Sequence, residues 1–433
     1  MISDEKQYKN KERIPKMNGV QFKTFFLLLF TIKIFIKLGL DLMNYCYLKK
    51  HAAIIPAELA TVIATEQMHR INSYNIAKII FHSGRFLFSS LLLLFFLFSP
   101  LYSIYTNWFV SFPMPYLFQG LLFFFTIHIT TWILDLPFDY FFHFRIEARY
   151  GFNKYTRKLW LGDQLKSIFV GSLVSAVILS LFFLLWGENF IFNWSYVFIG
   201  WLATVLLVVL LMYVVPILML PIFYQLKALV NETLTANISE LFSRSGLKVR
   251  GIFSADESKK STHANALITG IGRSKTIILF DTLLEHYSDE EILAMTAHEI
   301  GHGKKGHLFK LMSLTIIELF LFILFVSYFL AADFPYQAMG ITKILYSGLF
   351  AAYIFFFDLL TFFVQPLFSS YSRTLEYEAD DYSKQLLGSG APLQSSFQKL
   401  IRNEMDNINP HPWYEAYYYS HPTLLKRIQA LNH

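Results

Sequence analysis

One pentapeptide holds residue types that can do chemistry at a defined spacing, His298-Glu299-Ile300-Gly301-His302. On a helix, residues four positions apart lie on the same face, so His298 and His302 can reach a single metal ion. The glutamate between them then lies beside the open position of that metal, where it can take a proton from water. The pattern predicts a zinc peptidase with two histidine ligands and a general base.

The residues around the pentapeptide predict the helix that this chemistry requires. Ser288 is a preferred N-cap residue, and Glu291 completes a capping box three positions later. Acidic residues fill the first turn, and apolar residues then recur at helical spacing as far as Ile300. Because Gly303 and Gly306 weaken a helix, we expect it to end there and the chain to turn into the next apolar segment.

A second acidic stretch holds Glu376 and Asp380 one helical turn apart. Glu376 can supply the oxygen ligand that completes a site of two histidines and one glutamate. Asp380 can accept the free ring N–H of a ligating histidine and fix its tautomer. The alternative is a solvated acidic helix face, and the upstream histidine pair favours the ligand interpretation. Glu378 points elsewhere, His307 falls on the wrong face of its helix, and His263 is predicted to be a surface histidine.

The composition predicts a membrane protein. Of the 433 residues, 55% are hydrophobic and only 16% are charged, whereas a soluble domain has about 25% charged residues. Long apolar runs predict about seven transmembrane helices and a mainly helical, polytopic fold. In the first run Lys33 and Lys37 are expected to snorkel to the interface, the alternative being a polar interior. The runs are residues 22–45, 85–105, 116–136, 168–187, 196–222, 308–332 and 345–367.

Basic residues in the loops predict the orientation. The connections 46–84 and 137–167 carry many lysines and arginines, whereas Lys343 is the only one in the turns on the other side. By the positive-inside rule, the loop 223–307 and the C-terminal tail then face the cytoplasm. The Lys-rich N-terminus opposes this assignment, and the agreement of three loops outweighs it. Basic residues of the shorter loops are Lys49, Lys50, Arg70, Lys78, Arg145, Arg149, Lys154, Arg157 and Lys158.

The predicted organisation splits the catalytic lobe in sequence. Residues 1–222 form an N-terminal transmembrane region of about five spans, with loop 137–167 on the catalytic side. Residues 223–307 hold the histidine pair, and residues 308–367 form two more transmembrane helices. Residues 368–433 return to the same side with the third ligand, so the two parts together form a single zinc metalloprotease lobe.

The first part of this lobe also predicts a small β element. Residues 247–255 alternate apolar and polar side chains, and residues 276–281 are rich in β-branched types. The segment around Asn265 lies between them. An exposed edge strand there could hold an extended peptide by β-addition.

Other features of the sequence narrow the class. Cys46 is the only cysteine, so an intrachain disulfide is excluded. The net charge of +6 is spread over connecting segments, which predicts no nucleic-acid partner. The polar start of the chain, with no small-residue cleavage site after the first apolar run, predicts that no signal peptide is removed.

The motifs together resemble the type I CAAX prenyl proteases, which are similar around the metal site to the HtpX-like bacterial membrane proteases. The resemblance runs from about residue 136 to the C-terminus. The Tyr-Gly-Phe-Asn stretch and the motif near the chain end favour the prenyl protease branch. The segments that carry it are Ile146-Glu147, Tyr150-Gly151-Phe152-Asn153-Lys154, Asn265-Ala266, residues 278–284, the histidine helix, residues 372–380, Tyr419-Ser420-His421-Pro422 and Arg427.

The resemblance implies a role for each matching residue and a family architecture. Seven helices would enclose a water-filled chamber with one zinc ion per chain at its cytoplasmic end. The partners would be a peptide or protein substrate and the lipid bilayer, and whether the substrate is prenylated stays open. In the implied site His298, His302 and Glu376 bind zinc, Glu299 is the base, Asp380 supports a ligand, Asn265 binds substrate backbone, and His421 and Arg427 act near the cleaved bond, where they could stabilise an oxyanion.

Two further expectations concern the membrane in which the protein resides and the functions that rival a prenyl protease. The chain ends Ala430-Leu431-Asn432-His433 without the endoplasmic-reticulum retrieval signal of eukaryotic members, which favours a bacterial cytoplasmic membrane over the endoplasmic reticulum. One rival function is a quality-control protease of HtpX type. The other is a non-catalytic scaffold stabilised by zinc, and Glu299 argues against it because a structural zinc site needs no base.

Overall fold

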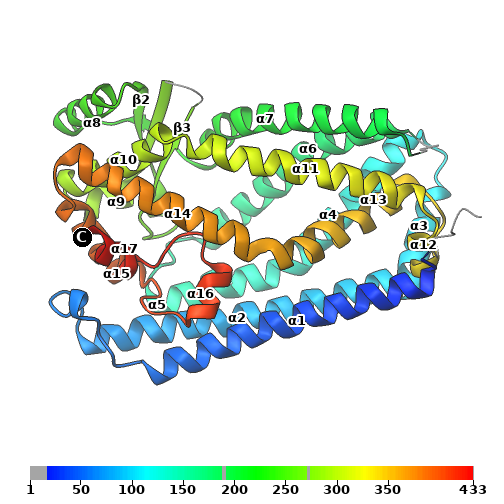
Figure 1. Ribbon diagram of the computed structural model, residues 1–433, viewed down its shortest axis with the longest axis horizontal. Helices are drawn as coiled ribbons and strands as arrows, with labels where there is room; N and C mark the ends of the chain where they lie inside the picture. The colour runs from blue at the N-terminus through cyan, green and yellow to red at the C-terminus, as the bar shows by residue number, and fades with distance from the viewer. Residues whose placement is uncertain (1–16, 188–191, 271–273, 433) are drawn as a thin grey trace, which may run out of the picture.

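The computed structural model describes residues 17–187, 192–270 and 274–432. Long helices run along the long axis of the molecule, and a lobe of shorter helices and strands lies at one end of them (Figure 1). The chain is mainly helical, and the strands of the described residues form one four-stranded sheet. The predicted class, a mainly helical polytopic membrane protein with a small β element, is confirmed.

Six helices of the described residues are long and apolar enough to cross a membrane. The helix α4 continues through a π-helical segment (Phe142–Glu147) into α5 (Ala148–Tyr150). The sixth candidate is one continuous helix made of three segments. The six are α2 (Thr65–Phe98), α4 (Tyr116–Phe141), α6 (Arg157–Trp186), α7 (Trp194–Phe223), α11 (His307–Ala331), and α13 (Leu345–Tyr353) joined by a π-helical segment (Ile354–Leu360) to α14 (Thr361–Leu387).

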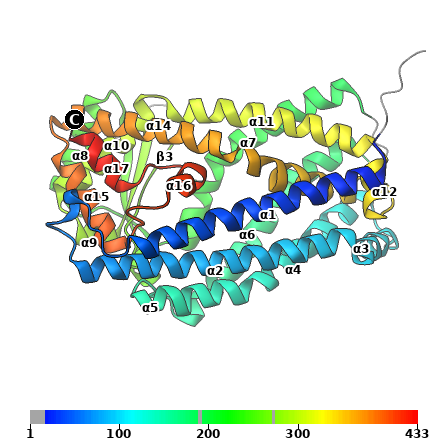
Figure 2. The ribbon, with the colours of Figure 1, turned by 60° about the horizontal axis from the view of Figure 1, so that its bottom comes forward.

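The first predicted span corresponds to α1 (Gly19–Lys50), which is not among these six. It lies beside α2, as both views show (Figures 1 and 2). The prediction that Lys33 snorkels is wrong, because its side chain is only 6% exposed and its Nζ lies 2.7 Å from Asp358 Oδ2. The π-helical segment before α14 brings this carboxylate within reach, so the ammonium is paired inside the helical body.

The predicted span at residues 85–105 is shifted along the chain. The helix α2 begins at Thr65 and ends at Phe98, and a separate helix α3 (Pro100–Val110) follows. The hydroxyl of Ser99 caps α3 by accepting a hydrogen bond from the Leu101 N–H. Proline has no N–H to continue a helix but fits its first turn, so the apolar run is cut in two.

The lobe contains the sheet, whose strands lie in the order β1-β2-β4-β3. The strands β2 (Lys248–Ala255) and β4 (Ser274–Phe280) run parallel, and β1 (Leu226–Ala228) and β3 (Ala266–Thr269) pair with them antiparallel. The two predicted strands are thus confirmed, and β3 lies at an edge. One face of the sheet packs on α8 (Glu232–Arg244), α9 (Asp281–His286) and α10 (Asp289–Lys304).

A second core joins the lobe to the membrane-spanning helices. Leu59, just before α2, Met68 and Tyr74, in its first turns, and Phe152, after α5, are buried against the C-terminal part of the chain. The loops 46–84 and 137–167 therefore contribute to the lobe together with the two predicted parts. The C-terminal part consists of α15 (Ala391–Glu404), α16 (Pro412–Tyr418) and α17 (Leu424–Leu431), while α12 (Phe334–Met339) lies at the opposite end (Figure 1).

Candidate active site

The helix α10 forms as the sequence predicts. The Ser288 hydroxyl accepts a hydrogen bond from the Glu291 N–H, and the Glu291 carboxylate accepts one from the Ser288 N–H. Gly301 lets α10 approach α14 closely, because an added Cβ would lie 3.1 Å from the backbone of Ala379. The close crossing brings the histidine face of α10 against the acidic face of α14.

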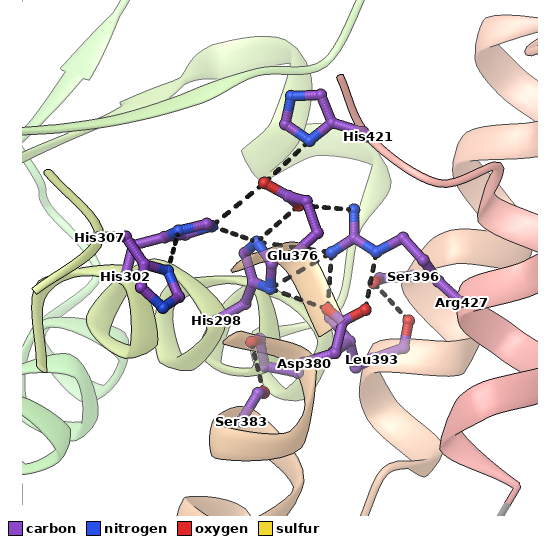
Figure 3. Close-up of polar contacts among 11 residues, drawn as sticks. His298, His302, His307, Glu376, Asp380, Ser383, Leu393, Ser396, His421 and Arg427 are labelled. Atoms are coloured by element: carbon purple, nitrogen blue, oxygen red, sulfur yellow. Dashed lines mark hydrogen bonds and ion pairs between the residues drawn. The ribbon is translucent and has the colours of Figure 1, made fainter. Parts of the chain in front are cut away.

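The ligand atoms of His298, His302 and Glu376 converge between these two helices (Figure 3). The Nε2 atoms of the two histidines are 3.1 Å apart. Nε2 of His298 lies 3.5 Å from Glu376 Oε2, and Nε2 of His302 lies 3.4 Å from Glu376 Oε1. We call these three residues the metal cluster. The structure thus brings together the three side chains predicted as ligands.

These separations suit a single metal ion. Ligand atoms at about 2.1 Å from a tetrahedral zinc ion lie about 3.4 Å apart. Glu376 Oε2 is buried and accepts no hydrogen bond from the described residues, although a buried carboxylate oxygen normally has a partner. Two imidazoles and one carboxylate are also the protein ligands of one class of catalytic zinc sites, which keep the fourth position for water or substrate. The cluster therefore fits a catalytic metal.

Asp380 and Arg427 support the metal cluster from the buried side. Asp380 Oδ1 lies 2.8 Å from Nδ1 of His298 and accepts a 2.6 Å hydrogen bond from Arg427 Nη2. Nε of Arg427 donates to the other oxygen of Asp380 at 2.8 Å, and its Nη1 lies 3.4 Å from Glu376 Oε2. Burial alone would lower the pKa of Arg427, but the carboxylates of Asp380 and Glu376 outweigh this effect and raise the pKa above its usual value. The guanidinium therefore stays charged.

The other predicted site residues lie on the open side. His421 is exposed, and its Nδ1 lies 3.0 Å from Glu376 Oε1. Glu299 is half-buried and lines a hollow of 430 Å³ together with His302. The walls of this hollow come from β3, α7 and the start of α11. Asn265 is exposed at the start of β3, where its side-chain oxygen accepts the Ala266 N–H at 2.8 Å.

His307, predicted to fall on the wrong face of its helix, contacts the metal cluster. Its Nδ1 lies 2.9 Å from Nδ1 of His302, and its Nε2 lies 3.1 Å from Glu378 Oε2. Glu378 also accepts a 3.0 Å hydrogen bond from Lys310. Both histidines of the metal cluster therefore have a partner at their second ring nitrogen. A ligating imidazole needs a hydrogen-bond partner at its second ring nitrogen, and this requirement could have pointed to His307 in the sequence.

A second cluster, of one histidine, two carboxylates and a tyrosine, was not predicted from the sequence. His263 pairs through Nδ1 with Glu404, and its Nε2 lies 3.1 Å from Glu147 Oε2. The Tyr74 hydroxyl donates to Glu147 Oε1 at 2.5 Å, and the Ala264 N–H donates to Glu404 at 2.9 Å. We call His263, Glu147, Glu404 and Tyr74 the anchoring cluster. It ties the segment that leads into β3 to α2, to the π-helical end of α4 and to α15.

The charge state of His263 follows from these contacts. Burial lowers the pKa of the imidazole, but the hydrogen bonds and charges of Glu147 and Glu404 raise it to about 9. His263 is therefore protonated at neutral pH and forms ion pairs with both carboxylates.

Comparisons with known proteins agree with this site. The model for the CAAX prenyl protease N-terminal region with five membrane helices matches residues 44–225, and the model for peptidase family M48 matches residues 228–433. CAAX prenyl protease 1 of Saccharomyces cerevisiae is 34% identical over 318 residues, which cover 70% of this chain and 69% of that protein. A CAAX prenyl protease 1 homolog of Oryza sativa subsp. japonica is 31% identical over 316 residues, with coverages of 70% and 71%.

A solved structure matches nearly the whole chain. The crystal structure of S. mikatae Ste24p has a TM-score of 0.86 and 27% sequence identity, and the match covers 96% of this chain and 99% of that chain. The chain as a whole therefore has a known fold.

Fold and site together define an integral-membrane metalloendopeptidase. The chain belongs to peptidase family M48, among the CAAX prenyl proteases. The predicted membrane metalloprotease is confirmed, and the HtpX-type alternative has no better support. A peptide or protein substrate and contact with lipid follow from this class.

Proposed function

We propose that the chain binds one zinc ion through His298, His302 and Glu376 and uses it to hydrolyse peptide bonds. The convergence of two imidazole nitrogens and one buried carboxylate is the observation that carries this proposal. When bound, zinc supplies Lewis acidity, which polarises the scissile carbonyl and lowers the pKa of water.

Glu299 is proposed as the general base and acid of the reaction. It lies next to His298 in the chain and lines the same hollow as His302, so it can accept a proton from the attacking water. It then passes this proton to the leaving amine. The Glu299→Gln variant should retain metal and lose hydrolysis.

The remaining residues are proposed to orient the reacting groups. Asp380 holds the tautomer of His298 through their 2.8 Å contact, and Arg427 in turn fixes Asp380. This assigns Arg427 to ligand support, since its guanidinium is buried and bonded to carboxylates, in place of the substrate contact that the resemblance implies. His421, which is exposed beside Glu376, is proposed to meet the developing oxyanion. Asn265 is proposed to bond substrate backbone as the peptide extends along β3.

We infer that the substrate is a C-terminal peptide carrying a prenyl group, on the strength of the CAAX prenyl protease relatives. The test compares a farnesylated CAAX peptide with its unprenylated twin, using purified zinc-loaded protein and Glu299→Gln as the blank. Cleavage of the farnesylated peptide alone is the expected result. Equal cleavage of both peptides would keep the protease and overturn the lipid requirement, and cleavage by the blank would overturn the role of Glu299.

We propose that the catalytic lobe faces the cytoplasm, on the strength of the basic loops at that end. Cys46 is a built-in probe of this orientation, because it is the only cysteine and is exposed near the lobe end of α1. A membrane-impermeant maleimide should label it in sealed microsomes, whose outer face is the cytoplasmic one. Labelling only after detergent opens the microsomes would reverse the orientation.

The compartment is proposed on different grounds from those of the sequence analysis. The relatives from yeast and rice give no support to the bacterial membrane predicted there, and they favour the eukaryotic alternative, the endoplasmic reticulum. Fractionation of cells that express the tagged protein, with a marker for each membrane, tests this proposal. A bacterial source organism would overturn it.

A further inference from the structure

The second face of the sheet is only partly covered by the membrane-spanning helix α7. At one end of the strands, Ile278 and Phe280 pack against Leu220 and Tyr224. Further along, the sheet and α7 separate around a hollow of 610 Å³. The α7 wall includes Tyr213, Pro216 and Ile217, and the sheet wall includes Phe253, Thr276 and Arg250.

This hollow lies at the level where a bilayer gives way to water. The wall that α7 provides belongs to the last turns of an apolar helix that ends at Phe223, where the lobe begins. Tyr213 and Ile217 are 40% and 49% exposed, so the apolar wall opens outward. Tyrosine at the end of a transmembrane helix is typical of the lipid headgroup region. The hollow therefore has acyl chains on one side of it and water on the other.

Arg250 gives the mouth of the hollow a positive charge. The side chain is exposed and makes no hydrogen bond or ion pair with any other described residue. The register between β2 and β4 shifts at this position, between Val249 and Gly251. Since Val249 packs into the core on the other face, strand alternation sets the exposed Lys248 on the same side as Arg250. No carboxylate of the described residues lines the hollow to neutralise these charges.

We propose that this hollow binds an anionic phospholipid, with its phosphate on Arg250 and an acyl chain along α7. A guanidinium without a partner beside an apolar wall matches a phosphate joined to a hydrocarbon chain, because arginine binds phosphate through paired N–H groups. The Thr276 hydroxyl, on the same wall, can donate a further hydrogen bond to the headgroup. The occupant is a lipid and not a soluble anion, since most of the lining is apolar.

The lipid site adjoins the proposed active site without sharing its chemistry. The hollow of 610 Å³ and the hollow that contains Glu299 have Tyr213, Pro216, Thr269 and Gly270 in common. Gly270 follows β3 directly and has a φ of 110°, and the four shared residues lie between the two spaces. A lipid on one side of these residues would brace the end of the edge strand on the other.

The test measures lipid retention by the full-length protein. Purified protein is placed in phosphatidylcholine nanodiscs with or without phosphatidylglycerol, and the lipids that remain bound after transfer to detergent are counted by native mass spectrometry. We expect preferential retention of phosphatidylglycerol and a loss of about fivefold in Arg250→Gln, which is the effect of one basic residue at a membrane surface. Arg250→Lys keeps the charge but loses the paired N–H groups, so it should retain only part of the preference.

Lys227→Gln is the matched control. Lys227 is an exposed lysine on the neighbouring strand β1, and strand alternation puts it on the face opposite to Leu226, which lines the hollow. Its loss should leave lipid retention unchanged. Equal retention by wild type and Arg250→Gln, or no preference for phosphatidylglycerol, would overturn the proposal. Displacement of the lipid by glycerol 3-phosphate alone would also overturn it, in favour of a soluble phosphate.

Discussion

The metal cluster and the anchoring cluster are built from the same residue types and differ in how those residues meet. In the metal cluster, two histidines direct their Nε2 atoms and Glu376 directs its carboxylate toward one point. In the anchoring cluster, His263 stands alone between two carboxylates, and each ring nitrogen has one of them. In the metal cluster the nitrogen and oxygen lone pairs remain available to a cation. In the anchoring cluster the protonated imidazole of His263 is itself the cation between the two carboxylates.

This difference shows that a group of histidine and glutamate residues is not by itself a metal site. Both clusters combine histidine with glutamate in the lobe, yet only the one at His298 and His302 has its donors converging on a point. The anchoring cluster serves another need. It joins the segment before β3 to the ends of two membrane-spanning helices, and so sets the edge strand relative to the body. We therefore expect damage to the first cluster to remove metal and damage to the second to remove stability.

The largest expected effect is a difference in zinc content between two variants, each of which lacks one glutamate of one cluster. Glu376→Ala should lose bound zinc and activity together, beyond the roughly 10–100-fold cost of losing a supporting partner. Glu404→Ala should keep its zinc, because among the described residues this carboxylate bonds only to His263 and the Ala264 N–H. Elemental analysis of the purified variants measures the contrast. Full zinc content in Glu376→Ala would remove it from the metal cluster.

The next effect tests the support of the metal cluster. Asp380→Asn keeps the shape of the side chain but removes the charge that faces Nδ1 of His298 and Arg427. Zinc affinity or activity should fall by roughly 10–100-fold, as for other partners of ligating histidines. Titration with a competing chelator gives the affinity. An unchanged affinity would mean that the 2.8 Å contact does not orient the ligand.

A smaller effect is expected from Glu147→Gln in the anchoring cluster. The change leaves the Tyr74 hydroxyl and the protonated His263 with a weaker partner, so the free energy of unfolding should fall by about 1–3 kcal/mol. Zinc content should not change. Denaturation in detergent measures the loss, and Glu66→Gln, at an exposed position near the start of α2, is the control. Equal stability of the two variants would contradict the anchoring role.

The smallest effect concerns pH. The pKa of His263 is raised from 6.5 to about 9 in the folded protein, so folding favours the protonated form. Its contribution to stability is then complete below about pH 6.5 and is lost as the pH rises through about 9. The wild type should lose stability between these values, and His263→Gln should lose less. Parallel curves for the two proteins across that range would contradict the ion pairs.

Local pattern made part of this site predictable. The caps and periodicity of α10 lie within sixteen residues, and Glu376 and Asp380 are one turn apart, so the sequence shows both. The anchoring cluster joins residues 116 and 141 positions apart, and the pair of Lys33 with Asp358 spans 325. No spacing rule reaches so far, because such contacts depend on how the helices pack. A snorkelling lysine and a surface histidine were therefore the local interpretations of Lys33 and His263.

The continuity of the helix from Leu345 to Leu387 has a mechanical consequence. Its 43 residues amount to about 65 Å of rise, roughly twice the hydrocarbon thickness of a bilayer. Glu376 lies in α14, which follows the π-helical segment and extends into the lobe. When a thinner bilayer tilts the span, the carboxylate is expected to shift relative to the two histidines unless α10 moves with α14. Bilayer thickness should then affect the geometry of the metal cluster, and by reciprocity a metal ion held there should resist the tilt.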